Sequence, residues 1–436
     1  MLSAVNGKSV GKRDVLKAAK DGDVRYVRLS FVDILGIEKS VSVPVAELER
    51  AIDGNVSFDG GSIDGFVRDA EVDMVLLPDL STFSILPWTK GAATEARLIC
   101  AIANADGSDF EGCPRTTLRR VLDDARDVLK KVDAALEVEF YMFPRSESGA
   151  PMIQSSEVGS YFDWSPNDRG DYARGAVVAA LQEMGLVISS SHHEHGQDQH
   201  EIDLAETPIL RSADNFVTLR GAVKHVASGL GLEATFMPKP AEDVAGNGLH
   251  VYFGLDDLDE DQRLHAIGGL LAHAAAATAV CNPTVNSYKR LVAAWDAPIY
   301  TVWSEASANA LVRVPTAPGM ETKIEMRSPD PSCNPYLAFA VLIEAIADGL
   351  RHRRLPGDPF TGSSYELTGK VRAERGIRTL PKSLRQAIDE LDTDAVLRGA
   401  LGDHIYHAFR DAKLAEYERY RRVVHPWERA QYLTRF

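Results

Sequence analysis

The sequence is poor in cysteine and in positive charge, and it shows no membrane or secretion signal. Its four cysteines are scattered without the spacing of a metal site or a disulfide framework, as is typical of a reducing cytoplasm. Lysine and arginine total 48 against 63 acidic residues, and the net charge of −15 argues against a general nucleic-acid binder. No apolar run of membrane length stands out, and residues 1–24 lack the apolar core of a signal peptide. We therefore expect a cytoplasmic protein with neither a membrane nor a nucleic-acid partner.

The length of 436 residues favours two domains of unequal size. Alternating apolar residues predict strands at 27–31, 41–45, 74–77 and 97–103, which indicate a small, mostly β domain. Strands and helices then mix over more than 300 residues, so the fold class is α+β. We place the two domains at residues 1–108 and 109–436.

The larger part is rich in predicted helices. An amphipathic helix opens at Pro114, where Leu118, Val121 and Leu122 fall on one face. Further helices are predicted at 173–183, 215–230, 263–280, 335–349 and, as a helical tail, 395–422.

One strand combines a buried pattern with two acids. Residues 135–143 are apolar and aromatic apart from Glu137 and Glu139, whose side chains point to the same face because strand side chains alternate. Two like charges on one face of an apolar strand are costly unless a cation lies between them. An isolated pair of this kind usually lies on a solvated strand face. Further acids on other strands would favour a cation site instead.

Four further stretches carry polar side chains that strand or loop geometry would direct toward the interior of the protein. Each alone is more often a solvated strand face or a satisfied core histidine. The residues are His192 and Glu194, which share a face, then Glu201, His250 after a Gly-rich loop, and Glu325 between Lys323 and Arg327.

Together these stretches supply a set of five glutamates with His250. Such an oxygen-rich set suits Mg²⁺ or Mn²⁺ better than Zn²⁺, and two such ions indicate phosphoryl transfer. Three arginines lie in apolar stretches of the sequence: Arg290, Arg313 and Arg327. An arginine side chain can form two parallel hydrogen bonds to a carboxylate or a phosphate.

The chain resembles the type I glutamine synthetase family. The resemblance extends from about Val24 to Tyr432 and rests on several long sequence motifs that occur in the family's order. They are Phe58–Ile63, Glu137–Phe140, His192–Glu194, Ala234–Pro240, Asn282–Val292, Asn334–Ala338 and His425–Glu428.

The resemblance implies a small β-grasp domain and a catalytic domain built on a curved antiparallel sheet. It also implies a homo-oligomer, a dodecamer of two stacked hexameric rings, whose active sites lie between neighbouring subunits. The implied substrates are glutamate, ammonium and ATP, and the implied cofactors are two or more Mg²⁺ or Mn²⁺ ions per site.

The resemblance also implies roles for individual residues. One metal would be held by Glu139, Glu194 and Glu201, and the other by Glu137, His250 and Glu325. Glutamate would be held by Gly246, His250, Arg290 and Arg327, and the ATP phosphates by Arg313. The ammonium site would be formed by Asp59 and Ser62 of the neighbouring subunit, with Tyr161 and Glu194.

The implied mechanism has two steps. The γ-carboxylate of glutamate attacks the γ-phosphate of ATP, while metals and arginines offset the charge. Ammonium then loses a proton to Asp59 and attacks the acyl phosphate. A flap excludes water in the meantime.

Five positions depart from the family pattern. Ala245 replaces an asparagine that contacts glutamate, and Ala308 replaces an arginine that assists phosphoryl transfer. Asp296 replaces the flap glutamate with its charge kept. At the nucleotide end Lys323 replaces an arginine, while Tyr252 and Gly254 replace a histidine and a serine.

These departures leave three functions open. The first is an ammonia ligase that makes glutamine, favoured by the acids at Asp59, Glu194 and Asp296. The second is a ligase for another amine or acid, because Ala245 and Ala308 enlarge the pocket. The third is a poorly active scaffold or regulator, which the loss of the arginine at Ala308 would explain.

Two further residues concern regulation. Arg68 resembles a feedback-sensing arginine of one branch of the family. Tyr365 aligns loosely with a tyrosine that is adenylylated in another branch, but we expect a plain surface tyrosine there.

Overall fold

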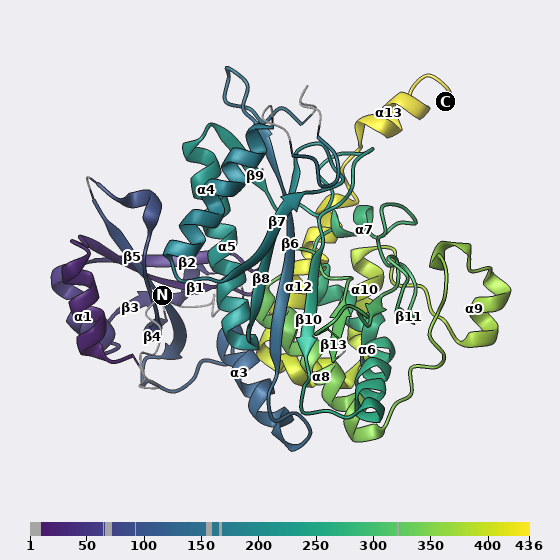
Figure 1. The fold of residues 1–436 in the computed structure, drawn as a ribbon, viewed down its shortest axis with the longest axis horizontal. Coiled ribbons are helices and arrows are strands. Elements are labelled where there is room, and N and C mark those ends of the chain that lie inside the picture. The colour runs from purple at the N-terminus through teal and green to yellow at the C-terminus, as the bar shows by residue number, and fades with distance from the viewer. Residues whose placement is uncertain are drawn as a thin grey trace.

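The chain folds around two separate β-sheets, a small one near the N-terminus and a large central one (Figure 1). The computed structural model describes residues 10–63, 65, 72–91, 93–153, 159–164, 168–320 and 322–436. Within these ranges the small sheet has five strands and the large sheet eight. The expected α+β class is confirmed, because a small, mostly β part precedes a larger part of mixed strands and helices.

The small sheet has the strand order β2-β1-β5-β4-β3 and is mixed, because β1 and β5 run parallel. Val27, Leu29 and Leu98 have no exposed surface and fill its core, against which helix α1 packs Val15 and Ala19. The elements are α1 (Lys12–Asp21), β1 (Tyr26–Val32), β2 (Glu38–Pro44), α2 (Leu48–Ile52), β3 (Ser57–Asp59), a 3₁₀ turn at Gly60–Ser62, β4 (Asp73–Ile85) and β5 (Glu95–Asn104).

The large sheet has the order β11-β12-β13-β10-β6-β8-β7, with β9 added beside β6. All its pairs are antiparallel except β11 with β12. Its strands are β6 (Asp133–Pro144), β7 (Ile188–His193), β8 (Gln199–Pro208), β9 (Leu232–Thr235), β10 (Leu249–Gly254), β11 (Trp303–Ser304), β12 (Val312–Arg313) and β13 (Lys323–Met326).

Helices cover one side of this sheet and leave the other to the functional residues (Figure 1). Along β6, Leu136, Val138 and Phe140 are buried in the helix-covered core, so Glu137 and Glu139 face the opposite way. The helices are α3 (Pro114–Asp124), α4 (Arg169–Glu183), α5 (Ile209–Gly229), α6 (Glu260–Cys281), α7 (Ser287–Arg290), α8 (Pro335–His352), α9 (Gly369–Arg375), α10 (Leu384–Thr393), α11 (Ala395–Leu401), α12 (Asp403–Tyr420) and α13 (Pro426–Tyr432).

Helix α6 is long and apolar enough to cross a membrane, contrary to the expectation that no apolar run reaches membrane length. However, 78% of its most apolar 18-residue stretch is buried inside the fold, as expected for a core helix. It packs closely on α8 through glycines: a Cβ atom added at Gly269 would lie 2.0 Å from the Ala345 carbonyl oxygen. The apolar composition of α6 therefore reflects contact with other helices.

The predicted helical tail at 395–422 is two helices. Gly402 separates α11 from α12 with a φ of +77°, a conformation that residues with a side chain rarely adopt. Helices α2, α7, α9, α10 and α13 and strands β3, β9, β10, β11 and β12 were not predicted. The other predicted helices and strands exist, with ends shifted by a few residues.

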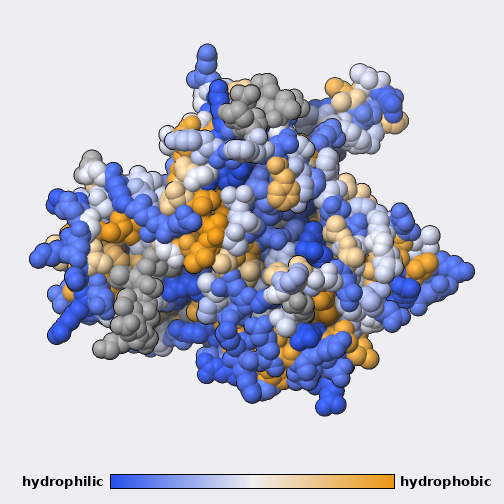
Figure 2. Space-filling view, in the orientation of Figure 1, coloured by the Kyte–Doolittle hydropathy of each residue, from blue (hydrophilic) through white to orange (hydrophobic). Residues whose placement is uncertain are grey.

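Most of the face drawn in Figure 2 is hydrophilic, as the charge composition leads one to expect. A hydrophobic patch lies left of centre, where the small-sheet domain meets helices α4 and α5. Helix α13 projects from the body at the upper right of Figure 1.

Candidate functional site

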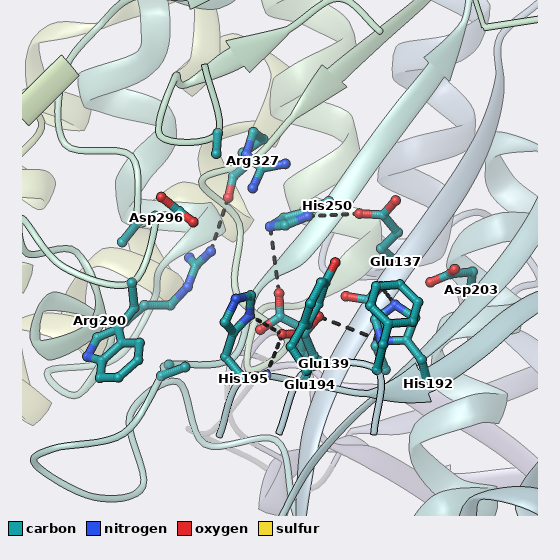
Figure 3. A pocket seen from close by; sticks show the side chains of 18 of the residues that line it. Glu137, Glu139, His192, Glu194, His195, Asp203, His250, Arg290, Asp296 and Arg327 are labelled. Carbon is teal, nitrogen blue, oxygen red and sulfur yellow. Dashed lines mark hydrogen bonds and ion pairs between the residues drawn. The ribbon is translucent and has the colours of Figure 1, made fainter. Parts of the chain in front are cut away.

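A cavity of about 630 Å³ opens on the helix-free face of the large sheet. Figure 3 shows acids and histidines from the strands on one side of it, and Arg290, Arg327 and Asp296 on the other. The predicted residues that line it are Glu137, Glu139, Tyr161, Glu194, Glu201, Gly246, His250, Arg290, Asp296, Arg313 and Arg327.

Strand register brings the acids together. Glu139 on β6 lies opposite Glu201 on β8, and Glu201 lies opposite His192 on β7. On the other side of β6, Glu137 lies opposite His250 on β10. Directly opposed residues project from the same face of a sheet, so the side chains form a continuous polar row.

The first cluster in this row consists of Glu137, His250 and Glu325. One ligand atom from each lies within 4.8 Å of the others, and His250 Nδ1 is 3.0 Å from Glu137 Oε2. Tyr252 donates a hydrogen bond to Glu137 at 2.7 Å. Burial alone would raise the pKa of Glu137, but His250, Tyr252 and the charge of Arg327 lower it to about 2. Glu137 is therefore held as a carboxylate.

The second group contains Glu139, Glu194 and Glu201. Glu139 accepts hydrogen bonds from Gln199 Nε2 at 3.0 Å and from the Gly248 N–H at 2.9 Å. Burial, together with the charge of Glu194, raises the pKa of Glu139. The pKa of Glu201 is also raised, by burial and by the charges of the neighbouring acids.

These residues fit a divalent cation. Carboxylate oxygens with one imidazole are the donors that Mg²⁺ and Mn²⁺ accept, and a cation would remove the repulsion that raises the pKa values. A second set of converging ligand atoms belongs to His192, Glu201 and Asp203. Asp203 Oδ1 is buried without a hydrogen-bond partner, so this side chain can accept more.

Two arginines face Glu325, which has no exposed surface. Arg313 and Arg327 each donate a hydrogen bond to a different oxygen of this carboxylate. Arg313 also donates to the Tyr252 hydroxyl at 2.9 Å. The pair therefore places two fixed positive charges at the cavity wall, next to the first acid cluster.

Arg290 approaches the cavity differently. Its guanidinium donates to the carbonyls of Arg327, Ser328 and Pro329, and burial lowers its pKa. A Cβ atom added at Gly246 would lie 2.8 Å from Arg290 Cγ, so the loop before β10 can pass this close only with glycine.

Two family models match almost the whole chain. The model described as "Glutamine synthetase, beta-Grasp domain" matches residues 23–105, and "Glutamine synthetase, catalytic domain" matches residues 111–432. The chain belongs to the glutamine synthetase family.

Individual members of the family agree with this assignment. The glutamine synthetase of Methanosarcina mazei is 42% identical over 441 residues, which cover 98% of either chain. That of Thermus thermophilus is 42% identical over 442 residues, 98% of this chain and 99% of the other. The solved structure of a GmaS/ADP complex is 27% identical, with a TM-score of 0.86 over 97% of this chain and 99% of the other. Plasmodium falciparum glutamine synthetase, at 23% identity and a TM-score of 0.85, shares the fold over 99% of this chain and 100% of its own.

Three residues that the family resemblance pointed to lie behind the cavity wall. Glu325 and Tyr252 touch lining residues without lining the cavity themselves. The Lys323 ammonium binds Glu206, so its assignment to the nucleotide stays a prediction.

Asp59 and Ser62 are not among the residues that line this chain's own cavity. Asp59 belongs to β3 of the small sheet, where its carboxylate accepts from the Gly61 N–H at 2.8 Å. A contribution to another subunit's site, as the resemblance implies, stays a prediction.

Three of the substituted positions line the cavity. Ala245 and Ala308 both line the cavity, as does Asp296, whose φ is +55°. Tyr365 is partly buried, and its hydroxyl donates to the Ala297 carbonyl at 2.8 Å; the expectation of a plain surface tyrosine was wrong. Arg68 lies outside the described residues.

Several lining residues were not predicted to belong to the site. For His192 the sequence predicts only a strand face shared with Glu194, and it predicts no site role for Phe162, Asp203 or Trp295. His195 was missed altogether, although it bonds Glu194 and stacks on Tyr161. A histidine directly after a predicted ligand was the one signal that the sequence offered.

Proposed function

We propose that this cavity is the active site of an ATP-dependent ligase that forms glutamine from glutamate and ammonia. Glutamine synthetases that are 41–42% identical over nearly the full chain support this activity over the two alternatives. The observation that carries the proposal is the convergence of Glu137, His250 and Glu325 beside two arginines on one sheet face. Phosphoryl transfer needs such an arrangement, because charge on phosphate oxygens must be offset by groups already in place.

The divalent ions would be Mg²⁺ or Mn²⁺, two or more per site. Glu139, Glu194 and Glu201 would hold one, and the cluster of Glu137, His250 and Glu325 the other. When bound, such ions offset the charge of the phosphate oxygens and orient the transferred group.

In the first step an oxygen of the glutamate γ-carboxylate bonds to the γ-phosphorus of ATP, and the bond from that phosphorus to the bridging oxygen breaks. Glutamate is held by Gly246, His250, Arg290 and Arg327 in this proposal. Arg313 acts on the ATP phosphates, with Lys323 and Tyr252 at the nucleotide end. The hydrogen bonds of Arg313 to Glu325 and Tyr252 support its part, because they fix the guanidinium before the reaction begins.

In the second step ammonia attacks the γ-carbonyl carbon of the acyl phosphate, and phosphate leaves. Ammonium would first be held by Tyr161 and Glu194 together with Asp59 and Ser62 of the neighbouring subunit. Asp59 would take the proton that makes the nitrogen nucleophilic. Asp296 lies on the segment that would close over the intermediate and exclude water.

The assembly would be the dodecamer of two hexameric rings, built from a β-grasp domain at 1–108 and a catalytic domain at 109–436. Two observations favour an oligomer: Asp59 is absent from the chain's own cavity, and the projecting α13 exposes Trp427 and, just after it, Leu433. The four buried, unpaired cysteines favour the cytoplasm as its compartment.

The proposal is tested by incubating the purified full chain with Mg²⁺, ATP and glutamate, and measuring phosphate and glutamine. Ammonium is compared with a panel of primary amines. Phosphate and glutamine formed together with ammonium would support the proposal. Phosphate release only with another amine would favour the alternative ligase, and no release with any acceptor would favour the regulator.

A further inference from the structure

His195 makes two contacts to a single oxygen of Glu194. Its backbone N–H donates to Glu194 Oε2 at 2.8 Å, and its ring Nδ1 lies 2.8 Å from the same atom. A carboxylate oxygen only accepts hydrogen bonds, so Nδ1 carries the proton in this contact. The other oxygen, Oε1, is 3.8 Å from His192 Nδ1 and remains available for a cation.

The ring of His195 has a second partner in Tyr161. The two rings stack with centroids 4.2 Å apart and an angle of 22° between their planes. Tyr161 also meets Phe162 and His192 edge to face, at 4.3 and 5.6 Å. His192 Nε2 in turn lies 3.1 Å from Glu201 Oε1. Three rings, with Phe162 packed beside them, therefore connect Glu194 to Glu201.

The segment that carries Tyr161 depends on such contacts. Tyr161 is 44% exposed, and the next residue, Phe162, has a φ of +61°, which a residue with a side chain rarely adopts. Within the described residues 159–164, the Phe162 N–H donates to the His193 carbonyl at 3.0 Å and so holds this stretch to the end of β7. The stack on His195 fixes the tyrosine ring at the cavity.

We propose that His195 is a positioning residue that orients Glu194 and Tyr161 together and thereby sets the affinity of the site for ammonium. This inference rests on the proposed function, in which both residues bind ammonium. Ammonium has four N–H donors and little else to recognise, so its affinity depends on acceptors held at fixed positions. Glutamate and ATP are held by groups on other elements, so at saturating Mg²⁺ their binding does not pass through His195.

Two substitutions separate the two contacts of the ring. His195→Phe keeps a stacking ring and removes the Nδ1 donor, whereas His195→Asn keeps a short N–H donor and removes the ring. Because the hydrogen bond is to a charged group, His195→Phe is expected to raise the KM for ammonium by about tenfold. With Mg²⁺ saturating, the KM values for ATP and glutamate and the kcat at saturating ammonium should stay within about twofold. His195→Asn should show a smaller rise in the KM for ammonium.

A matched control is available outside the cavity. His225 also combines an Nδ1 contact, 2.7 Å from the Gly221 carbonyl, with a stacked ring, 5.1 Å from that of Trp88. His225→Phe should leave all three KM values unchanged. If His195 had only a structural role, its variants would lose thermal stability and all kinetic parameters would change together. An unchanged KM for ammonium in both His195 variants would overturn the proposal.

A Mn²⁺ titration of the protein separates failure of this proposal from failure of the proposed function. Should the native chain form no glutamine, the proposed function fails, but the position of Glu194 can still be measured. His195→Phe should then weaken Mn²⁺ binding several-fold relative to the native chain and to His225→Phe. Equal Mn²⁺ affinity in all three proteins would overturn the positioning role.

Discussion

Glu325 has no exposed surface, yet it meets three cationic or ionisable side chains. Arg313 and Arg327 bind its two oxygens, and His250 Nδ1 is 3.5 Å away. A buried carboxylate is stable only when such partners surround it, and removing its charge leaves them facing a neutral group. At the scale of single residues, Glu325 therefore links the arginines of the cavity to its proposed metal ligands.

Glu325→Gln should lower the free energy of unfolding by about 3 kcal/mol, because it breaks a buried ion-pair network. Urea denaturation measures this, and Mn²⁺ titration should show at least a roughly tenfold loss of affinity. The control is Glu344→Gln on α8. Glu344 lies 3.0 Å from the part-exposed Arg351, so this variant should lose about 1 kcal/mol of unfolding free energy or less. Equal losses in the two variants would contradict the role given to Glu325.

At the scale of elements, side-chain contacts join helices and loops around the site. The segment with Trp295 and Asp296 has two consecutive positive φ values, +52° and +55°, and Tyr365 donates to the carbonyls of Ala294 and Ala297 on either side. Strained backbone persists only where the surroundings hold it, so the tyrosine hydroxyl helps to maintain this shape.

Tyr365→Phe should therefore loosen the covering segment and let water reach the acyl phosphate. The expected result is a ratio of phosphate to glutamine that rises above one, with the ATP-dependent rate otherwise retained. Both products are measured in the same reaction. A ratio that stays at one would show that the hydroxyl does not help to exclude water.

His273 joins three helices. Its Nδ1 lies 2.6 Å from Asp394, the N-cap residue of α11, and its Nε2 lies 3.0 Å from Asp348 on α8; Arg354 also binds Asp348. Burial alone would lower the pKa of His273, but the hydrogen bonds to Asp394 and Asp348 raise it above its ordinary value. Both ring nitrogens can donate only when the imidazole is charged.

A raised pKa in the folded state has a defined effect on stability. The stabilisation is fully present below the unfolded pKa of about 6.5 and is lost as pH rises through the raised folded pKa. Relative to His273→Gln, the native chain should lose up to about 1.4 kcal/mol of unfolding free energy per pH unit in that window. Urea unfolding between pH 6 and 9 tests this, and parallel curves for the two proteins would contradict it.

For the strands, the sequence predicts which side chains share a face but not which residues pair across the sheet. The shared face of Glu137 and Glu139 follows from the two-residue period of a strand and is confirmed, since both line the cavity. The pairing of Glu139 with Glu201 and of Glu137 with His250 depends on register, which local patterns do not encode. His195 was missed because its ring partner, Tyr161, lies more than thirty residues away in the chain.

At the scale of the whole molecule, the central expectation is that active sites lie between subunits. Asp59 lies in the small sheet and does not line the cavity of its own chain, whereas Glu325 lies behind the wall of that cavity. A head-to-tail ring would bring the small domain of one subunit to the cavity of the next.

Asp59→Asn keeps an oxygen to accept the Gly61 N–H and removes the proposed base. This variant and Glu325→Gln should each be inactive alone. Co-assembled in equal amounts, they should recover about a quarter of the native activity, because one site in four pairs two intact halves in a head-to-tail ring. Mixed assemblies without activity would mean that both residues serve the same subunit's site.

The most direct test of the whole account uses glutamate labelled with ¹⁸O in its γ-carboxylate. If that carboxylate attacks ATP and ammonia then displaces phosphate, the C–O bond breaks and one labelled oxygen leaves with each phosphate. We predict inorganic phosphate with one ¹⁸O atom, formed in equal amount with glutamine and only when ammonium is present. Unlabelled phosphate would contradict an acyl-phosphate intermediate, and with it the function that we assign to this cavity.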